Sequence, residues 1–483
     1  MNSFDEIDVL DLHGNSLKKE KAPDGSADKN VFDIQQGVAI ILMVKKAKRS
    51  KTCTVRHADL WGLREEKYAF LSSHDSRTIK KGMLRPSPPY YFFVPTKDEH
   101  KEVWEGYPRI IDIFPVNVTG IVTARDQFVI DMDKASLRNR IMQFRYLSTD
   151  DEFIRLSYKL KDTRGWKLSA ARKRLAQDDR WDTYFARILY RPFDIRWIYY
   201  TPTMVDWGRP EVMRHMLQPN LSLVLPRRVE TAIPWSHIFL SESIIEHVAV
   251  SLKTIDYCFP LYLYPDTNKR DLFSGNDSGE RVPNIAPWLF AALAKAYKKP
   301  PKAEAIFNYI YGIFFSSAYR KKYEEPLKID FPRVPLTADF QLFRHLADKG
   351  EELADFHLLQ SKKLDKPVSR CEGPGGLSVG TPIYDGKRKR IYLNREKYFS
   401  PVSRDVWEYR VGGYQVAQKW LKDRKGKTLS SEDVSHYCRV LTALAETIRI
   451  QPSLDDLFAA VEERPLKVAS PGAASGPGRR ASR

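Results

Sequence analysis

The sequence contains only four cysteines among its 483 residues, and no two of them are close together. Cys53, Cys258, Cys371 and Cys438 form no Cys-x-x-Cys pair, so the spacing predicts neither a zinc knuckle nor a disulfide framework. Free thiols are typical of a reducing compartment, and we expect a cytoplasmic protein. Cys258 stands between two aromatic residues in an apolar segment, which predicts a buried and unreactive thiol.

Long apolar runs are also absent. The longest, Gly37–Val44, is far shorter than the roughly 20 residues that span a bilayer. Acidic residues, Asp5, Glu6 and Asp8, stand where a signal peptide would have its basic region. The sequence therefore predicts no membrane insertion and no secretion.

Local motifs for cofactors, nucleotides and metals are missing too. There is no Gly-x-Gly-x-x-Gly, no P-loop and no His-Glu-x-x-His, so we expect no cofactor-binding and no metal-binding residues in this chain alone. Asp385-x-Lys387 and Asp423-x-Lys425 are similar to half of a nuclease site, but neither has an upstream acidic partner at a sensible spacing. We interpret both pairs as chance products of a Lys-rich chain.

One short string is similar to a catalytic motif. Ser87-Pro88-Pro89-Tyr90 matches the (Asn/Asp/Ser)-Pro-Pro-(Tyr/Phe) pattern of enzymes that methylate exocyclic amines of a flipped base. That motif closes a hydrophobic strand, whereas here charged residues precede it and the apolar strand Tyr90–Val94 follows. We interpret it as a proline turn that enters an edge strand, and we predict no catalytic residue.

The sequence does contain a mixed pattern of strands and helices, so the expected fold class is α+β (mixed α/β). Strands are expected at Ile7–Leu12 and Val38–Val44. The second is apolar on both faces, as in a strand inside a sheet covered on both sides. Further strands are expected at 128–130, 197–200, 221–225 and 259–264, and helices at 135–144, 287–297, 303–319 and 414–427. A capping box of Ser430 and Asp433 predicts the start of a final helix.

Positive charge is concentrated near the C-terminus. The formal net charge is +18, and the 43 residues from Asp385 to Lys427 contain thirteen Lys or Arg and five Asp or Glu, roughly +8. The Asp-Gly pair within Ile383–Leu393 predicts a hairpin. Alternation along its second strand places Arg388, Arg390 and Tyr392 on one face. A solvated basic face is the alternative. We predict DNA contacts from Arg388, Lys389, Arg390, Arg395, Lys397, Lys419, Lys422, Arg424, Lys425 and Lys427.

Several strings resemble, in family order, the C-terminal portion of type ISP restriction–modification enzymes. They are Asp-Leu-His-Gly-Asn at 11–15, the segment at 30–40, Thr-Gly-Ile-Val-Thr-Ala-Arg-Asp at 119–126, Tyr-Arg-Pro-Phe-Asp-Ile-Arg at 190–196, the segment at 259–264 and Lys-Trp-Leu-Lys-Asp-Arg-Lys-Gly at 419–426. The similarity runs from about residue 4 to residue 460. Those enzymes join a nuclease, a translocase, an adenine methyltransferase and a target-recognition domain.

The resemblance implies a domain plan. Residues 1–50 would be the last strands of a Rossmann-like methyltransferase sheet, 51–195 a connecting region, 196–465 a DNA-specificity domain and 466–483 a disordered basic tail. Phe32 falls near the place of an aromatic that stacks on the flipped adenine, although a core phenylalanine is the alternative.

The resemblance also implies a partner and a cofactor. The S-adenosylmethionine loop and the catalytic Pro-Pro-Tyr strand, which lie upstream in the family, are not in this sequence. We therefore expect duplex DNA recognition without catalysis by this chain alone. The alternatives are an adenine methyltransferase completed by a separate upstream polypeptide, with S-adenosylmethionine as its cofactor, and a decayed fragment.

Overall fold

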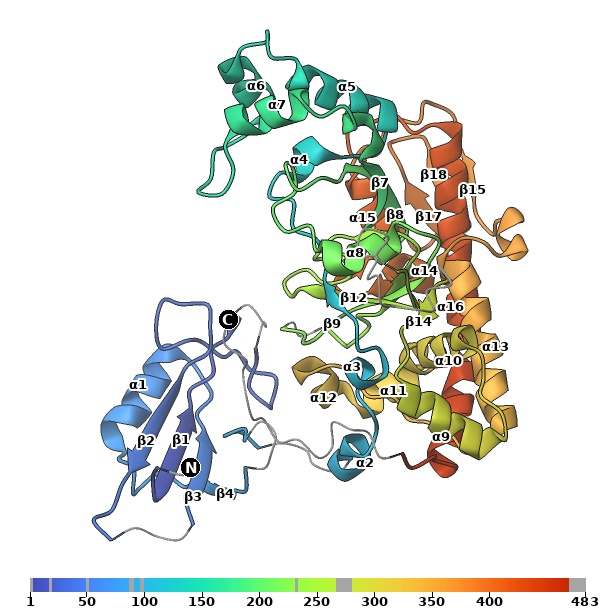
Figure 1. The fold of residues 1–483 in the computed structure, drawn as a ribbon. Coiled ribbons are helices and arrows are strands. Elements are labelled where there is room, and N and C mark those ends of the chain that lie inside the picture. Colours follow the sequence, from blue (N-terminus) through green and yellow to red (C-terminus); the bar gives the residue numbers. More distant parts are fainter. Residues whose placement is uncertain are drawn as a thin grey trace, which may run out of the picture. The chain divides into compact units, whose positions relative to one another are not determined.

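A computed structural model describes residues 3–16, 20–48, 52–86, 91–95, 100–230, 233–265 and 280–468 (Figure 1). Two compact units share the chain. Unit 1 is built mainly by residues 1–102, and unit 2 by residues 103–229 and 233–470. Both units combine helices with small sheets, which confirms the expected mixed α/β fold. Residues 103–195 pack in the same unit as the residues that follow them.

Unit 1 is a four-stranded sheet in the order β2-β1-β3-β4, with one helix of its own. Its strands are β1 (Glu6–Asp11), β2 (Ala39–Val44), β3 (Thr54–Asp59) and β4 (Gly82–Leu84), and α1 spans Arg64–Ser73. β1 pairs with β3 in parallel and with β2 antiparallel. The helix follows β3, and its Leu71 packs with Leu10 and Leu12 at the end of β1. Its Lys67 Nζ also donates to Leu12 O at 2.7 Å.

The second apolar strand forms at its expected place, but it is not buried. β2 lies at one edge of the sheet, and every one of its six residues is exposed; Ile41, Leu42 and Met43 keep 45–47% of their surface. The expectation of burial is therefore wrong for this chain, because the described residues of unit 1 supply neither a further strand nor a layer over β2. An apolar edge of this kind is a template for another strand.

Unit 2 contains two four-stranded sheets with the orders β10-β9-β12-β5 and β11-β7-β8-β6. Their strands are β5 (Val118–Thr119), β6 (Ile130–Asp131), β7 (Phe185–Arg191), β8 (Asp194–Tyr199), β9 (Ser222–Pro226), β10 (Phe239–Ser241), β11 (Ile244–Ile245) and β12 (Asp256–Pro260). A third sheet has the order β15-β18-β17-β16, from β15 (Arg370–Glu372), β16 (Ile383–Asp385), β17 (Arg390–Tyr392) and β18 (Tyr398–Ser400). Two short pairs are β13 (Tyr262–Leu263) with β14 (Val282–Pro283), and β19 (Arg410–Val411) with β20 (Tyr414–Gln415).

Helices surround these sheets. They are α2 (Lys101–Glu105), which spans the junction of the units, α3 (Ile110–Ile113), α4 (Asp126–Val129), α5 (Lys134–Arg145), α6 (Asp151–Tyr158), α7 (Leu168–Ala176), α8 (Pro210–Met216), α9 (Pro287–Tyr297), α10 (Ala303–Phe315), α11 (Ser317–Lys322), α12 (Glu324–Ile329), α13 (Phe340–His357), α14 (Arg404–Glu408), α15 (Val416–Lys422) and α16 (Ser431–Glu463). α13 packs on α10 and α16 (Figure 1).

Among the described residues, no helix is both long and apolar enough to cross a membrane.

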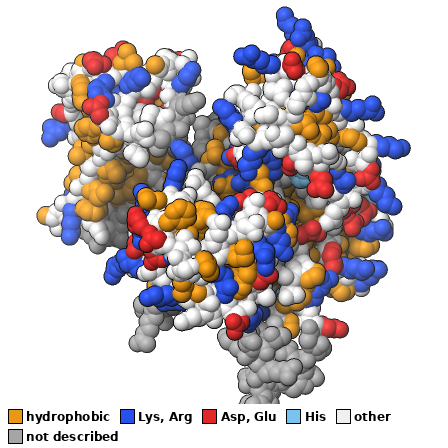
Figure 2. Space-filling model, turned by 90° about the horizontal axis from the view of Figure 1, so that it is seen from above, with side chains coloured by type: hydrophobic (Ala, Val, Ile, Leu, Met, Phe, Trp, Pro, Cys, Tyr) orange, Lys and Arg blue, Asp and Glu red, His pale blue; other side chains and the backbone are white. Residues whose placement is uncertain are grey.

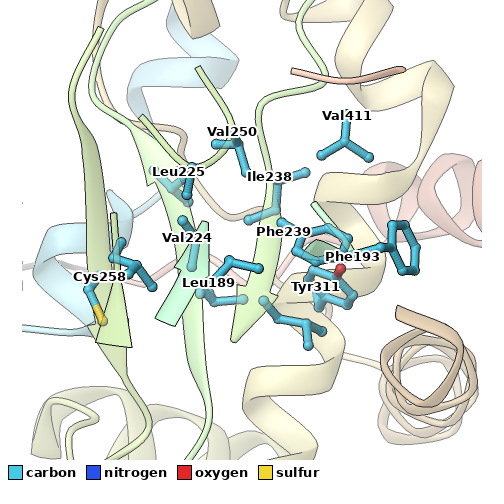
Figure 3. Close-up of a cluster of buried hydrophobic side chains, with 14 of the residues drawn as sticks. Leu189, Phe193, Val224, Leu225, Ile238, Phe239, Val250, Cys258, Tyr311 and Val411 are labelled. Atoms are coloured by element: carbon cyan, nitrogen blue, oxygen red, sulfur yellow. The ribbon is translucent and has the colours of Figure 1, made fainter. Parts of the chain in front are cut away.

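A continuous apolar core joins the sheets of unit 2 to these helices. Figure 3 shows side chains from β7, β9, β10 and β12 converging with Tyr311 of α10 and Val411 of β19. Cys258 is fully buried there, and burial raises the pKa of its thiol to about 12. The expectation of an unreactive core cysteine is confirmed.

Strong local signals placed several helices correctly. α9 starts at Pro287, α5 covers the expected 135–144, and α16 begins with the Ser430–Asp433 capping box. The expected helix at 303–319 is wrong as one element, because Ser316 ends α10 and its side chain caps α11.

Other expected elements are shorter or of a different kind. Residues 126–129 form a helical turn and only Ile130 of the expected strand lies in β6, while 259–264 divides into β12 and β13. Residues 414–427 form β20, α15 and a turn, because Tyr414 pairs with Val411 across Gly412–Gly413. Residues 91–94 are not a strand, and Tyr90 lies outside the described residues.

Candidate nucleic-acid interface

The predicted basic hairpin is present. Ile383 pairs with Tyr392 and Asp385 pairs with Arg390, which confirms the hairpin. Its turn spans residues 386–389, so Arg388 lies in the turn and only Arg390 and Tyr392 lie in a strand. The carboxylate of Asp385 accepts hydrogen bonds from the backbone N–H groups of Lys387 and Arg388, at 3.0 and 3.1 Å. This Asx turn uses the acid within its own loop. The hairpin is not an isolated ribbon, because β17 also pairs with β18.

Cations and tyrosines alternate on the outward face of this sheet. Arg388 is exposed, and its Nη1 lies 3.4 Å from the hydroxyl of Tyr392. The guanidinium of Arg390 stacks over the ring of Tyr398 at 4.0 Å, and the rings of Tyr392 and Tyr398 are 5.6 Å apart. Stacking holds the Arg390 guanidinium in place on this face. Interleaved guanidinium and aromatic groups suit contact with phosphates and bases.

The second basic segment consists of α15 and the turn after it. Lys422, Lys425 and Lys427 are exposed. Lys419 is half-buried and forms an ion pair with Asp423 one helical turn later. The exposed lysines follow one another along the turn that leads into α16, so their charges face solvent.

Arg424 behaves differently from its neighbours. It is 7% exposed; its Nη2 lies 3.1 Å from the carboxylate of Asp194, and its guanidinium lies 3.5 Å from the centre of the Trp420 ring. Asp194 also accepts from Arg196, which reaches Asp423 at 3.2 Å. The structure therefore assigns Arg424 to an internal charge network rather than to the exposed surface.

This network explains the string Tyr-Arg-Pro-Phe-Asp-Ile-Arg at 190–196. Burial alone would raise the pKa of Asp194, but the charges of Arg196 and Arg424 hold it below its usual value. Arg191, at the other end of the string, pairs with the buried carboxylate of Glu246 at 2.7 Å. The sequence showed the string but not its partners, which are far along the chain.

The two basic segments are both hydrogen-bonded to one short extended segment, residues 378–380. Val379 N donates to Lys427 O at 2.8 Å, and Gly380 N donates to Leu393 O at 2.8 Å. The side chain of Asn394 also donates to Ser378 O. Residues 378–380 thus join the turn after α15 to the end of the hairpin, so the structure brings the two clusters together.

Three further predicted cations of the hairpin region complete the group. Arg395 is exposed, as is Lys389 in the turn, while Lys397 is half-buried and its Nζ donates to Gly373 O at 2.7 Å. Six of the ten predicted cations are therefore exposed: Arg388, Lys389, Arg395, Lys422, Lys425 and Lys427. On the face seen in Figure 2, Lys and Arg side chains are interspersed with Asp and Glu.

In unit 1, Phe32 is on the surface and its backbone is fixed. Its side chain is 55% exposed, which argues against the core alternative. Its N–H donates to Asn30 Oδ1 at 2.9 Å, and its carbonyl accepts from Arg64 Nη2 at 2.9 Å. Asn30 is itself buried and donates to Gly14 O and Gln36 O. A rigid loop thus presents an aromatic side chain to solvent.

One His–Asp group in unit 1 was missed by sequence reasoning. Asp11 and Asp59 end the neighbouring strands β1 and β3, and the ring of His13 lies between carboxylates. Its Nε2 is 2.8 Å from Asp59 and its Nδ1 is 3.4 Å from Glu20, while the ring stacks on Trp61. Both nitrogens are engaged, so this group forms a polar network within the loop.

Among the described residues, the two Asp-x-Lys pairs do not form such a group. Asp385 closes its own turn, and Asp423 pairs with Lys419 and Arg196. The string Ser87-Pro88-Pro89-Tyr90 lies outside the described residues.

One family model matches most of this chain. Residues 112–451 match the model of the Type ISP C-terminal specificity domain. No curated protein sequence matches the chain.

Three solved structures share the fold. They are a DrdV–DNA complex (20% identity, TM-score 0.67, 93% of this chain and 47% of that one), the ATP-dependent Type ISP restriction–modification enzyme LlaBIII bound to DNA (20%, 0.68, 94% and 31%), and a nuclease-deletion mutant of the Type ISP enzyme LlaGI with a DNA substrate mimic (18%, 0.62, 94% and 43%). This chain spans less than half the length of each of those proteins. The family match covers most of unit 2, and the chain belongs to the family defined by the Type ISP C-terminal specificity domain.

Proposed function

We propose that this chain recognises a specific sequence in duplex DNA, as the specificity part of a restriction–modification enzyme. The observation that carries the proposal is the family match over residues 112–451, which covers most of unit 2 and both basic segments. The three similar structures are complexes of those proteins with DNA or a DNA substrate mimic. A role on DNA implies the cytoplasm as the compartment.

The exposed cations supply the backbone contacts in this proposal. Arg388, Arg395, Lys422 and Lys425 have solvated charges, so releasing counterions from DNA phosphates favours their binding. Arg390, held over Tyr398, is the one half-buried arginine of the group whose planar fork suits a bidentate contact with a base edge. Lys397 and Lys419 have internal partners and contribute less.

The test is duplex binding as a function of salt. We expect the logarithm of the association constant to fall steeply with the logarithm of salt concentration. Replacing Arg388, Arg395, Lys422 and Lys425 together with alanine lowers the magnitude of that slope by about 3 to 4, since each phosphate contact adds about 0.9. Fluorescence anisotropy of a labelled duplex measures it.

A matched control and a specificity measurement complete this test. The double variant K295A/K299A removes two exposed lysines of the α9 region that lie outside the basic segments, and we expect its slope to equal that of the wild type. Selection from a randomised duplex pool should enrich one sequence. An unenriched pool, or a slope that the quadruple variant leaves unchanged, contradicts the proposal.

A second function, adenine methylation, is favoured by the exposed edge of unit 1. Among the described residues, no strand pairs with the outer side of the apolar β2, so this side fits a strand from another polypeptide. In this alternative, a separate polypeptide supplies the cofactor site and the catalytic strand, and Phe32 stacks on the target adenine.

The described residues of unit 1 do not fit S-adenosylmethionine. The two glycine N–H groups nearest the ends of the parallel strands, those of Gly14 and Gly62, both donate to the carboxylate of Asp28 at 2.6 and 3.0 Å. Lys67, fully buried, neutralises that carboxylate at 2.7 Å. The cofactor must therefore be held elsewhere if the second function is correct. Methyl transfer to DNA by the purified chain alone would contradict a cofactor site on a separate polypeptide. Loss of methyl transfer in F32A, with cofactor binding intact, would support the role of Phe32.

A further inference from the structure

A cavity of about 710 Å³ opens in unit 2, and none of its lining residues is one of the ten predicted DNA-contact cations. Its walls come from residues 233–236, the start of α11, β19 and the middle of α16. Ile233, Pro234 and the Trp235 ring form an apolar side, and polar groups of α11 and β19 form the other. A cleft with an apolar wall and a few convergent polar groups is the usual form of a small-ligand site.

Two residues that line this cavity have buried donors that make no hydrogen bond of ordinary geometry, the indole Nε1 of Trp235 and the Nη2 of Arg320, whose guanidinium has the Tyr409 hydroxyl as a neighbour. Both side chains are at least nine-tenths buried. Arg320 is fixed by its Nε, which donates to Phe314 O at 2.6 Å, and by the Phe315 ring 4.4 Å away. A buried donor without an acceptor is costly, so an acceptor from outside would be stabilised here.

Arg320 forms no ion pair among the described residues. Burial lowers the pKa of its guanidinium, while the neighbouring Tyr409 hydroxyl and the carboxylate of Asp455 act in the opposite direction. Asp455 lines the same cavity, but its two oxygens accept hydrogen bonds from Ser316, Ser317 and the N–H of Ala318. That carboxylate stabilises the start of α11 and attracts Arg320 without forming an ion pair with it.

The other two acids at the cavity have cationic partners of their own. Glu324 pairs with Lys328 at 2.7 Å and Glu408 with Arg404 at 2.8 Å, and neither cation lines the cavity. Lys321 and Arg410, which do line it, are exposed and pair with no carboxylate among the described residues. Three cations and three carboxylates line the cavity, but two of the carboxylates are paired with cations outside it, so positive charge and donors without ion-pair partners remain at the cavity.

We propose that this cavity binds a phosphate group, with Arg320 and Trp235 Nε1 as inner donors and Lys321 and Arg410 at the rim. Tetrahedral phosphate offers enough acceptors for these four donors, and guanidinium groups match it bidentately. The phosphate comes either from the backbone of bound DNA or from a free phosphate compound, and the two sources share this chemistry.

The first measurement uses inorganic phosphate as the probe. Titration of the full chain by calorimetry, against sodium chloride of equal ionic strength, should show one saturable site. The double variant K321A/R410A should weaken it at least about tenfold, which corresponds to one lost charge-assisted hydrogen bond. W235F removes the indole donor and keeps a smaller aromatic ring at a buried position, so it should weaken phosphate binding and also lower stability. Urea unfolding at the titration temperature checks that the variant is folded. The control K295A/K299A should bind phosphate as the wild type does.

The DNA arm identifies the source. If K321A/R410A also lowers the magnitude of the salt slope for duplex binding by about 2, the cavity receives a DNA phosphate. If it weakens inorganic phosphate and leaves duplex binding unchanged, the ligand is a free phosphate compound. Equal phosphate affinity in wild type, K321A/R410A and W235F overturns the proposal. That failure leaves the DNA-recognition proposal standing, because the latter is tested at Arg388, Arg395, Lys422 and Lys425.

Discussion

Arg424 and Asp194 form a buried ion pair that joins the basic segment after α15 to the start of β8, with Nη2 3.1 Å from Oδ1. The next residue along the chain, Lys425, is exposed. Two adjacent cations of similar sequence context thus have different physical roles, one in the core and one in solvent.

Replacing Arg424 with methionine should therefore lower stability without changing the DNA salt slope. Removing one partner of a buried ion pair typically costs about 3 kcal/mol, because the remaining charge is left in a poorly solvated site. Arg196 still pairs with Asp194, so we expect a loss at or below that value in urea unfolding. K425A is the matched control: we expect unchanged unfolding and a slope lower by about 0.9. A reversed pattern would show that Arg424 is a DNA contact.

This difference marks the limit of sequence reasoning for the site. The charge count located both basic segments and the Asp-Gly turn located the hairpin, since these signals are local. Arg424 could not be separated from Lys425, because its partner Asp194 lies 230 residues away. The same holds for β2, whose apolar residues predicted burial while its exposure depends on which strands are present beside it.

Two helix starts are predicted correctly from a proline or a capping box at the beginning of the helix. Pro287 and the Ser430–Asp433 capping box fix helix starts from neighbouring residues alone. The break at Ser316 depends on Asp455. Its carboxylate accepts hydrogen bonds from residues at the start of α11, which are 137–139 residues earlier in the chain. A helix that is stopped by a distant side chain is invisible to a local pattern.

Asp256 should make the stability of unit 2 depend on pH. It is fully buried, and burial raises the pKa of its carboxyl to about 8. The hydrogen bonds from the N–H groups of Val250 and Ser251 lower this pKa, but their effect is smaller than that of burial. The unfolded carboxyl ionises near pH 4, so between about pH 4 and pH 8 the native state holds a proton that the unfolded state has lost. Stability contributed by this group therefore falls as pH rises through that window.

The variant D256N tests this directly. The amide keeps the acceptor for Val250 and Ser251 and cannot ionise, so we expect it to be more stable than the wild type by about 2–4 kcal/mol at pH 7, and by much less at pH 4.5. Urea unfolding of both proteins at several pH values measures the difference. Parallel stability curves would mean that Asp256 is ionised in the folded protein.

The contact between α10 and α13 requires a glycine. A Cβ built on Gly350 of α13 would lie 1.9 Å from Asn308 O of α10, so G350A must push the two helices apart. Overpacking of this kind costs about 1–3 kcal/mol, more than alanine gains in helix propensity. Gly312, on the facing helix, is the graded control, because its Cβ would meet Leu346 at 3.1 Å. We expect a smaller loss of melting temperature in G312A than in G350A.

The exposed edge strand gives a prediction about association. Ile41 and Met43 of β2 pair with Val9 and Ile7 of β1, yet keep 45% and 47% of their surface exposed. Lysines at these two positions should reduce self-association, measured by sedimentation velocity, because charge on an edge strand opposes edge-to-edge pairing. The free energy of unfolding should change little, since the side chains are already half in water. If a second polypeptide pairs with β2, the same I41K/M43K variant should also lose that partner, whereas duplex binding by unit 2 should not change. Loss of duplex binding in this variant would mean that β2 belongs to the DNA interface instead.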